Sequence, residues 1–366
     1  MIAGHANKVN RSTKEKSVSR LKEGEGLRLR LRIDPVALVH LPWEYMALSE
    51  TSGEEQATDF LALRPEISIV RSDTVEAAKR SLPNRAVARV VGVLSSPDEM
   101  DDLDVEEDQA AINEAVQALN EKVGEVLVEV VWAKRPATRQ ALKEALVDGA
   151  DIFHFAGHAD FDQFSQKGQI VLEKDDYTAD LYSGEQLAQL LRGAGVRLVN
   201  LGACNTGRRD GQNVWSGVAP ALTRQKIPAV IANQFKIKDK YASLMAAEIY
   251  PLLLAGYTVD EAVSQARTAV YQDAGLEHRD WAAPVLYLHD KDGVLFRLLE
   301  IDAESQEGRG YFYQVAIKVK DVVGKGTQVR GFKSSKAPTK STSVDIKGRD
   351  VKDGAVIEGI RLGRFP

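Results

Sequence analysis

The chain has 366 residues, of which 44% are hydrophobic and 28% charged, a composition typical of a globular protein with one large domain or two smaller ones. Its formal net charge of −5 argues against a binder of nucleic acid. A single cysteine excludes an internal disulfide and a zinc site built on paired cysteines. Because no apolar run is long enough to predict a membrane span or a signal core, we expect a cytoplasmic protein without membrane contact.

Charge divides the chain into three parts. Residues 1–30 carry eight Lys/Arg and three Asp/Glu with little apolar content, and we predict a basic flexible arm over 1–26. Residues 301–366 carry 13 Lys/Arg against eight Asp/Glu, and their short β patterns with Gly, Lys and Ser turns predict a small β-rich appendage. The acidic middle, 27–300, is the predicted main domain. Its acidic run at 97–108 predicts an exposed loop that leads into a helix.

The predicted elements begin with two strands, 27–33 and 67–70, which form a small N-terminal β subdomain. Further along, β-branched runs predict strands at 87–94, 126–132, 151–156, 196–201, 227–232 and 284–288. Between them, helical periodicity predicts helices at 107–123, 138–147, 184–191, 214–224, 240–254 and 259–271. Strands that are apolar on both faces and separated by helices predict an α/β fold with a mostly parallel sheet that is covered on both sides.

Two of these strands end in residue types that can carry chemistry. One ends in His154-Phe-Ala-Gly-His158, and the other in Gly202-Ala-Cys204-Asn-Thr-Gly. Ligands collect at the carboxyl ends of strands in open α/β sheets, and consecutive strands are usually neighbours. An imidazole and a thiol could therefore face each other as a Cys–His pair. The alternative for a lone cysteine among apolar residues is a buried and inert small hydrophobe.

These two motifs, in this order, resemble the CHAT family, which are cysteine peptidases of the caspase–separase clan. Segments that resemble the family also occur at 41–44 (LPWE), 232–235 (ANQF) and 281–284 (WAAP), so that the resemblance covers about 27–299. It implies a caspase-like α/β sandwich. It also implies that a Cys204 thiolate attacks the scissile carbonyl while His158 acts as acid and base.

The resemblance distinguishes the two histidines: His158, at the strand end, is the catalytic one, and His154, in mid-strand, is structural. It further implies that the backbone N–H groups of Ala159 and Cys204 stabilise the oxyanion. The family usually has glycine where this chain has Ala159, and the N–H is retained. No third residue that orients the imidazole can be named. Two histidines without further ligands make a poor metal site, so we expect neither a metal nor another cofactor.

Four residues are candidates for the substrate pocket: Asp160, Gln234, Phe235 and Asp239, of which Asp239 could instead be a helix N-cap. Because positions 202–203 hold no acid, and lysines occupy positions 236 and 238, an uncharged substrate residue is expected.

The connection at 161–182 is long for a strand–helix link. Its centre, near 169–172, predicts a short hairpin, and the polar stretch at 175–180 predicts a mobile segment. We expect a lid that a partner orders; the alternative is a permanently ordered β arm.

The main functional hypothesis is a regulated cysteine endopeptidase with Cys204 as nucleophile and His158 as base. By resemblance it cleaves a dedicated protein substrate, for example a gasdermin-like protein, in bacterial signalling or defence, and it requires an activating partner or ligand. The alternative, from another class of protein, is a catalytically silent caspase-fold scaffold that binds a partner.

Overall fold

The computed structural model divides the chain into two compact units, one made of residues 1–70 and 301–366 and the other of residues 71–300. It describes residues 26–33, 41–47, 57, 60–72, 86–101, 103, 105–162, 167–202, 215–235, 237–290, 292–296, 312–319, 328–330, 341–346, 356–358 and 360–362. The predicted partition into arm, main domain and appendage stays a prediction.

The first unit joins strands from both halves of its sequence. In one sheet β15 (Ser341–Ile346), β13 (Phe312–Val319), β1 (Gly26–Ile33) and β3 (Ile67–Arg71) lie in that order, with β13 parallel to both β15 and β1. In a smaller sheet the order is β14 (Gln328–Arg330), β16 (Val356–Glu358), β17 (Ile360–Leu362) and β2 (Met46–Ala47). The short strands expected after residue 300 are therefore present, and two of them, β13 and β17, pair with β1 and β2 from the start of the chain.

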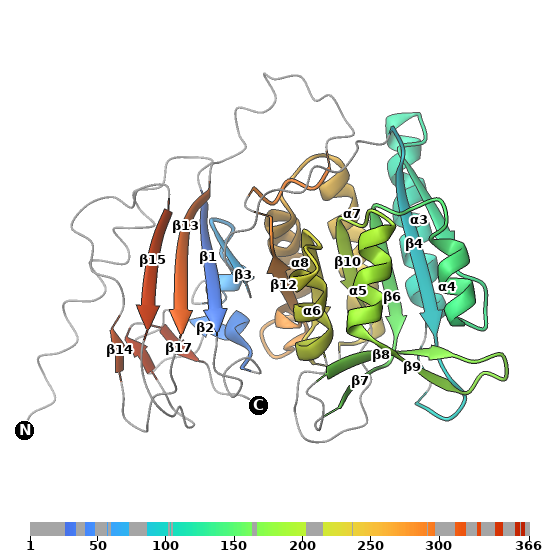
Figure 1. Ribbon diagram of the computed structural model, residues 1–366. Helices are drawn as coiled ribbons and strands as arrows, with labels where there is room; N and C mark the ends of the chain where they lie inside the picture. The colour runs from blue at the N-terminus through green and yellow to red at the C-terminus, as the bar shows by residue number, and fades with distance from the viewer. Residues whose placement is uncertain are drawn as a thin grey trace, which may run out of the picture. The chain divides into compact units, whose positions relative to one another are not determined.

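The second unit is built around a mostly parallel sheet (Figure 1). Its strands follow the order β12 (Pro284–Leu288), β11 (Ala229–Asn233), β10 (Leu198–Leu201), β6 (Ile152–Gly157), β4 (Ala88–Ser95) and β5 (Val128–Trp132). Only the pairing of β12 with β11 is antiparallel among these. Each strand lies within two residues of the range that its β-branched run predicted.

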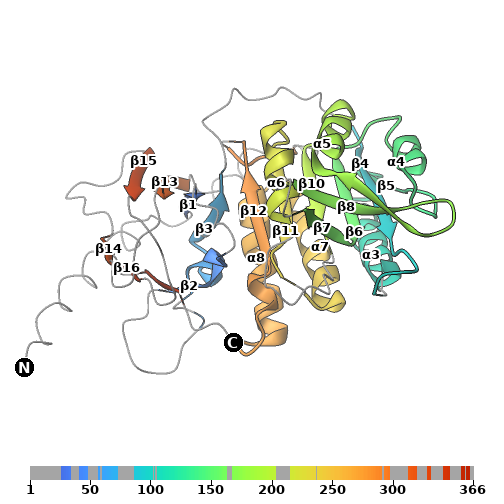
Figure 2. The same cartoon turned by 60° about the horizontal axis from the view of Figure 1, so that its bottom comes forward.

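Helices cover both faces of this sheet, as the apolar strands require (Figure 2). The helices are α3 (Val105–Val123), α4 (Arg139–Ala145), α5 (Gly184–Gly193), α6 (Trp215–Arg224), α7 (Asp239–Leu254) and α8 (Val259–Ala274). Figure 2 shows α4, α5 and α6 along one face and α3, α7 and α8 along the other. The α/β sandwich with a mostly parallel sheet that the sequence predicted is thereby confirmed.

Local capping explains where several helices begin. The side chains of Thr138, Ser183 and Thr258 accept hydrogen bonds from backbone N–H groups in the first turns of α4, α5 and α8. Thr258 and Glu261 form a complete capping box. These caps replace hydrogen bonds that the first turn of a helix otherwise lacks.

A third, antiparallel sheet occupies the long connection after β6. It consists of β7 (Ala159–Asp162), β8 (Lys167–Glu173) and β9 (Ala179–Ser183). Where we expected a mobile polar stretch, the structure has a hydrogen-bonded turn: Lys174 N–H donates to Thr178 O (2.8 Å), and the Thr178 hydroxyl donates to Asp176 Oδ1 (2.7 Å). The aspartate side chain orders the turn because it accepts hydrogen bonds from the residue two positions later.

Two kinds of feature, a membrane-spanning helix and a metal-binding cluster, are absent from the described part of the chain. None of its helices combines the length and the apolar character needed to cross a membrane. Nor does that part of the chain gather three or more His, Cys, Asp or Glu residues that could hold a metal ion.

Gly168 of β8 lies too close to α6 to carry a side chain. A Cβ at this position would come within 2.4 Å of the backbone nitrogen of Val218, which cannot rotate away. We predict that Gly168→Ala lowers the free energy of unfolding by about 1–3 kcal/mol, the usual cost of overpacking. Urea unfolding followed by circular dichroism measures this change.

Gly193→Ala in α5 is the matched control, because a Cβ there meets no atom within 4 Å. Its stability should equal or slightly exceed that of the wild type, since alanine is the better helix former. Equal stabilities for the two variants would contradict the predicted clash.

Candidate active site

Strands β6 and β10 bring the two motif-bearing strand ends to the same edge of the sheet. They pair in parallel, with Asn200 opposite His154, and the Gly202 N–H extends the ladder by donating to Phe155 O (2.7 Å). His158 directly follows β6. Cys204 lies outside the described residues, as does the rest of 203–214.

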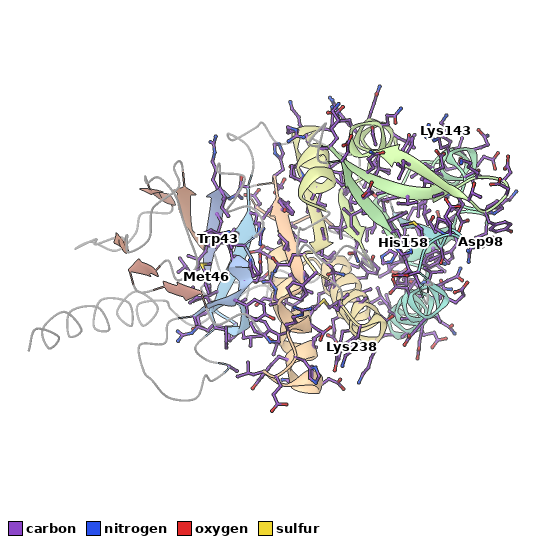
Figure 3. All side chains as sticks on the ribbon, turned by 90° about the horizontal axis from the view of Figure 1, so that it is seen from below. Trp43, Met46, Asp98, Lys143, His158 and Lys238 are labelled. Carbon is purple, nitrogen blue, oxygen red and sulfur yellow. The ribbon has the colours of Figure 1, made fainter. Side chains whose placement is uncertain are left out.

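His158 is held by a backbone carbonyl. The side chain has no exposed surface, and its Nε2 lies 2.8 Å from Asp101 O. Figure 3 labels His158 and also Asp98, which precedes Asp101 in the loop after β4. A carbonyl oxygen can only accept, so Nε2 must carry the proton. In the neutral ring, Nδ1 is then the unprotonated nitrogen that can act as a base.

The Asp101 carbonyl, which orients the imidazole of His158, could not be found from the sequence. Asp101 contributes its main-chain oxygen, which every residue type possesses, so no side chain marks the position. The acidic run at 97–108 does lead into a helix, as predicted, and α3 begins at Val105. Its last member, Asp108, is buried rather than exposed, which corrects the prediction of an exposed run up to that residue.

The turn between β8 and β9 fixes the loop that carries Asp101. The Asp98 N–H donates to Tyr177 O (3.1 Å), and the Ala179 N–H donates to Glu99 Oε1 (3.0 Å). Tyr177 has a positive φ of 63°, which turns its carbonyl group within the tight connection. The loop therefore rests on the hairpin formed by β8 and β9.

Glu173, at the end of β8, anchors the start of the same loop. Its carboxylate has no exposed surface and accepts hydrogen bonds from the Ser96 N–H (2.9 Å), the Arg135 guanidinium (3.0 Å) and the Ala137 N–H. A buried carboxylate needs such donors, because removing a charge from water is costly. The β8–β9 hairpin thus holds the loop at both Ser96 and Asp98.

Strand β8 also contacts the histidine itself. The Val171 N–H donates to His158 O (3.0 Å), and the Ser95 hydroxyl donates to Val171 O (2.8 Å). Ala159, the predicted oxyanion donor, begins β7 opposite Ile170, and both side chains lie in the main hydrophobic core. The Cβ that distinguishes Ala159 from the family's usual glycine is therefore accommodated in the core.

The pocket candidates have different environments. Gln234 is buried, and its side chain is used at both ends: Oε1 accepts from Arg71 (3.1 Å) and Nε2 donates to Ala282 O (2.8 Å). This bonding gives Gln234 a structural role at the end of β11. The ring of partly exposed Phe235, the next residue, lies 5.0 Å from the Arg279 guanidinium carbon.

The two acidic candidates lie on different elements. Asp160 is partly exposed on β7, opposite Gln169 of β8. Asp239 is the first residue of α7, and Lys238 occupies the N-cap position that was the alternative for Asp239. The side chain of Asp239 lies outside the described part of the structure.

His154 has the buried, hydrogen-bonded environment expected of a structural histidine. Its Nδ1 lies 2.7 Å from the hydroxyl of Tyr250 on α7. The same hydroxyl accepts a hydrogen bond from the Asn200 side chain (3.1 Å). Burial raises the pKa of Tyr250, so the hydroxyl keeps its proton.

Comparison with known proteins supports the resemblance seen in the motifs. A family model described as "CHAT domain" matches residues 11–288, which include both strand ends and finish with β12. The chain belongs to the CHAT domain family. No curated protein matches it.

Among solved structures, the CHAT domain chain is similar to gingipain R (RGPB), an Arg-specific cysteine proteinase, with 11% identity, a TM-score of 0.43 and coverage of 76% of this chain and 80% of that one. It is also similar to the Saccharomyces cerevisiae separase–securin complex, with 15% identity, a TM-score of 0.36 and coverage of 61% of this chain. This chain spans only 14% of that separase structure's chain. The family assignment rests on the family model.

We predict that neutral His158 carries its proton on Nε2, because only that tautomer can donate to Asp101 O. Two-bond ¹H–¹⁵N correlation spectra of the full chain with ¹⁵N-labelled histidine measure the tautomer at a pH above the imidazole titration. A His158→Gln variant assigns the signal. Protonation on Nδ1 would contradict the contact with the carbonyl.

Proposed function

We propose that this CHAT domain chain is a cysteine endopeptidase with Cys204 as nucleophile and His158 as general acid and base. The strand register carries the proposal. Asn200 of β10 lies opposite His154 of β6, and Cys204 and His158 each follow four residues further along the chain. Since parallel strands advance at the same rate per residue, this register favours adjacent positions for thiol and imidazole.

In the proposed mechanism, Cys204 gives its proton to Nδ1 of His158, and the thiolate attacks the scissile carbonyl carbon. Backbone N–H groups of Ala159 and Cys204 stabilise the oxyanion. The C–N bond then breaks, and the imidazolium returns the proton to the leaving amine. Water, deprotonated by the same imidazole, hydrolyses the thioester and regenerates the thiol. The Asp101 carbonyl keeps the opposite ring nitrogen protonated throughout, so that Nδ1 carries out every transfer.

We further propose a dedicated protein substrate, of which a gasdermin-like protein is one example, in a bacterial signalling or defence pathway in the cytoplasm. The burial of His158 supports an activation step. A peptide must reach this imidazole, which has no exposed surface, so neighbouring chain has to move before cleavage. A partner or ligand that binds the open form raises the active fraction in proportion to its preference for that form. The β8–β9 hairpin is a candidate for such control, because it holds the loop that carries Asp101.

We predict that Cys204→Ala abolishes cleavage and that His158→Ala lowers kcat/KM by about 10²–10⁴-fold, the range for losing a general acid–base group. Cleavage of a fluorogenic peptide library and of candidate proteins measures this loss. His278→Ala is the matched control, because this histidine is exposed in the connection between α8 and β12.

The scaffold alternative gives a different pattern. Under it the wild type and Cys204→Ala behave alike under every activating condition, and a thiol-directed peptide inhibitor modifies Cys204 no faster than a free thiol. That pattern would refute the endopeptidase.

We predict that the primary pocket selects an uncharged side chain. Arg279 lies over Phe235, and Lys238 is exposed at the start of α7, so a basic substrate side chain in this region would meet like charge. Profiling a peptide library for the residue before the cut tests this. Strong selection for Arg or Lys that Asp160→Asn or Asp239→Asn removes would show the prediction to be wrong.

A further inference from the structure

Three residues that follow β4, namely Asp101, Val105 and Asp108, contact β6 and His158. At the end of the strand, Asp101 O holds Nε2 of His158. Two residues earlier, Ala156 forms a hydrophobic cluster with Val105. Residues at alternate positions of a strand share a face, so the next contact is expected at His154.

That contact joins two buried polar side chains. Asp108 Oδ2 lies 3.6 Å from Nε2 of His154, and both residues are more than nine-tenths buried. The other carboxylate oxygen of Asp108 accepts a hydrogen bond from the hydroxyl of Ser243 on α7 (3.2 Å). The cavity that Asp108 and His154 line has a volume of only about 10 Å³, which excludes any ligand larger than a water molecule.

The hydrogen bonds around His154 determine which nitrogen carries its proton. The oxygen of Tyr250 accepts the Asn200 amide N–H, and within the described structure the only acceptor for its own proton is Nδ1 of His154. Nδ1 is therefore the acceptor nitrogen, and Nε2 carries the hydrogen. Among the described residues this N–H has no hydrogen-bond partner within the usual distance, and the carboxylate of Asp108 lies beside it.

The same pair borders the chain that leads to the proposed nucleophile. A Cβ on Gly202 would lie 3.3 Å from Asp108 Oδ2 and 3.6 Å from Nε2 of His154. Asn200, two residues earlier on the same strand, is joined to His154 through the hydroxyl of Tyr250. The pair therefore lies close both to the strand that precedes His158 and to the chain that leads to Cys204.

We infer that Asp108 and His154 form a positioning pair that holds segment 101–108 against β6 and so keeps the Asp101 carbonyl on His158. This inference rests on the proposed function, because it concerns the orientation of the proposed catalytic imidazole. In a dry environment a carboxylate attracts an N–H dipole strongly. Loss of the pair frees the start of α3, and the fraction of molecules with an aligned imidazole falls.

Alkylation of Cys204 by iodoacetamide tests the inference without a known substrate. This is the only cysteine of the chain, so the reaction of the full-length protein reports on one thiol. Its rate depends on the thiolate fraction, and a neighbouring imidazolium shifts the midpoint of the pH profile well below the value of about 8.5 for a free thiol. His158→Ala should return the midpoint to about 8.5. If it leaves the midpoint unchanged, the proposed function fails, independently of the positioning pair.

Asp108→Asn should raise the midpoint by roughly 0.5–1 pH unit, part of the way toward His158→Ala, because a less well-oriented imidazolium stabilises the thiolate less. In the His158→Ala background the same substitution should have no further effect, since the pair acts through His158. Tyr250→Phe, which removes the donor to Nδ1 of His154, should shift the midpoint in the same direction. It replaces Asp108→Asn in the test if that variant does not fold.

Asp151→Asn is the matched control. Asp151 is also a buried carboxylate beside β6, but it lies at the opposite end of the strand, where it binds Arg197 (3.1 Å). This variant should lose stability and keep the wild-type midpoint. The inference is overturned if Asp108→Asn and Tyr250→Phe both keep that midpoint while His158→Ala moves it, or if Asp108→Asn has the same effect with and without His158.

Discussion

The pairing of β6 with β10 in one parallel register is the constraint on which the candidate site depends. At the amino ends of these strands, the Asp151 carboxylate accepts hydrogen bonds from Arg197 and from the Arg89 N–H of the neighbouring strand. Asn200 lies opposite His154, and Leu201 lies opposite Phe155 at the end of the paired stretch. A slip of one residue would move the two motifs to opposite faces of the sheet.

Much of the fold could be predicted because strands buried on both faces leave continuous apolar runs, and helices leave a 3.6-residue period. The motifs also pointed to two strand ends, and the structure places the strands β6 and β10 that lead to them side by side. The Asp101 carbonyl that binds Nε2 of His158 could not be predicted, because a main-chain carbonyl has no sequence signature. Likewise, the hydrogen bond between Gln234 and Arg71 could not be predicted, because the two residues lie far apart in sequence. Long-range pairing of this kind depends on the tertiary fold rather than on local pattern.

The acidic residues show how the meaning of a charge depends on its donors. An acidic run is usually a solvated surface, and the residues around Asp98 fit that expectation. Asp108 and Glu173 are buried instead, each accepting from a side chain or backbone donor that lies far away in sequence. Both side chains connect the loop and helix after β4 to other parts of the second unit. The carboxylates at these two positions therefore help to hold the loop and the helix near His158 in place.

The pairing of β1 with β13 has a consequence for biosynthesis. Gly26 lies opposite Phe312, so β1 leaves the ribosome long before its partner exists. At typical translation rates the delay is roughly 15–60 s, during which residues 71–300 can already fold. For that period the edge of β1 that later pairs with β13 is an unpaired strand edge, which can pair with another chain. A chaperone that shields this strand until translation reaches β13 would raise the yield of folded protein, and truncation before β13 would leave the strand permanently open.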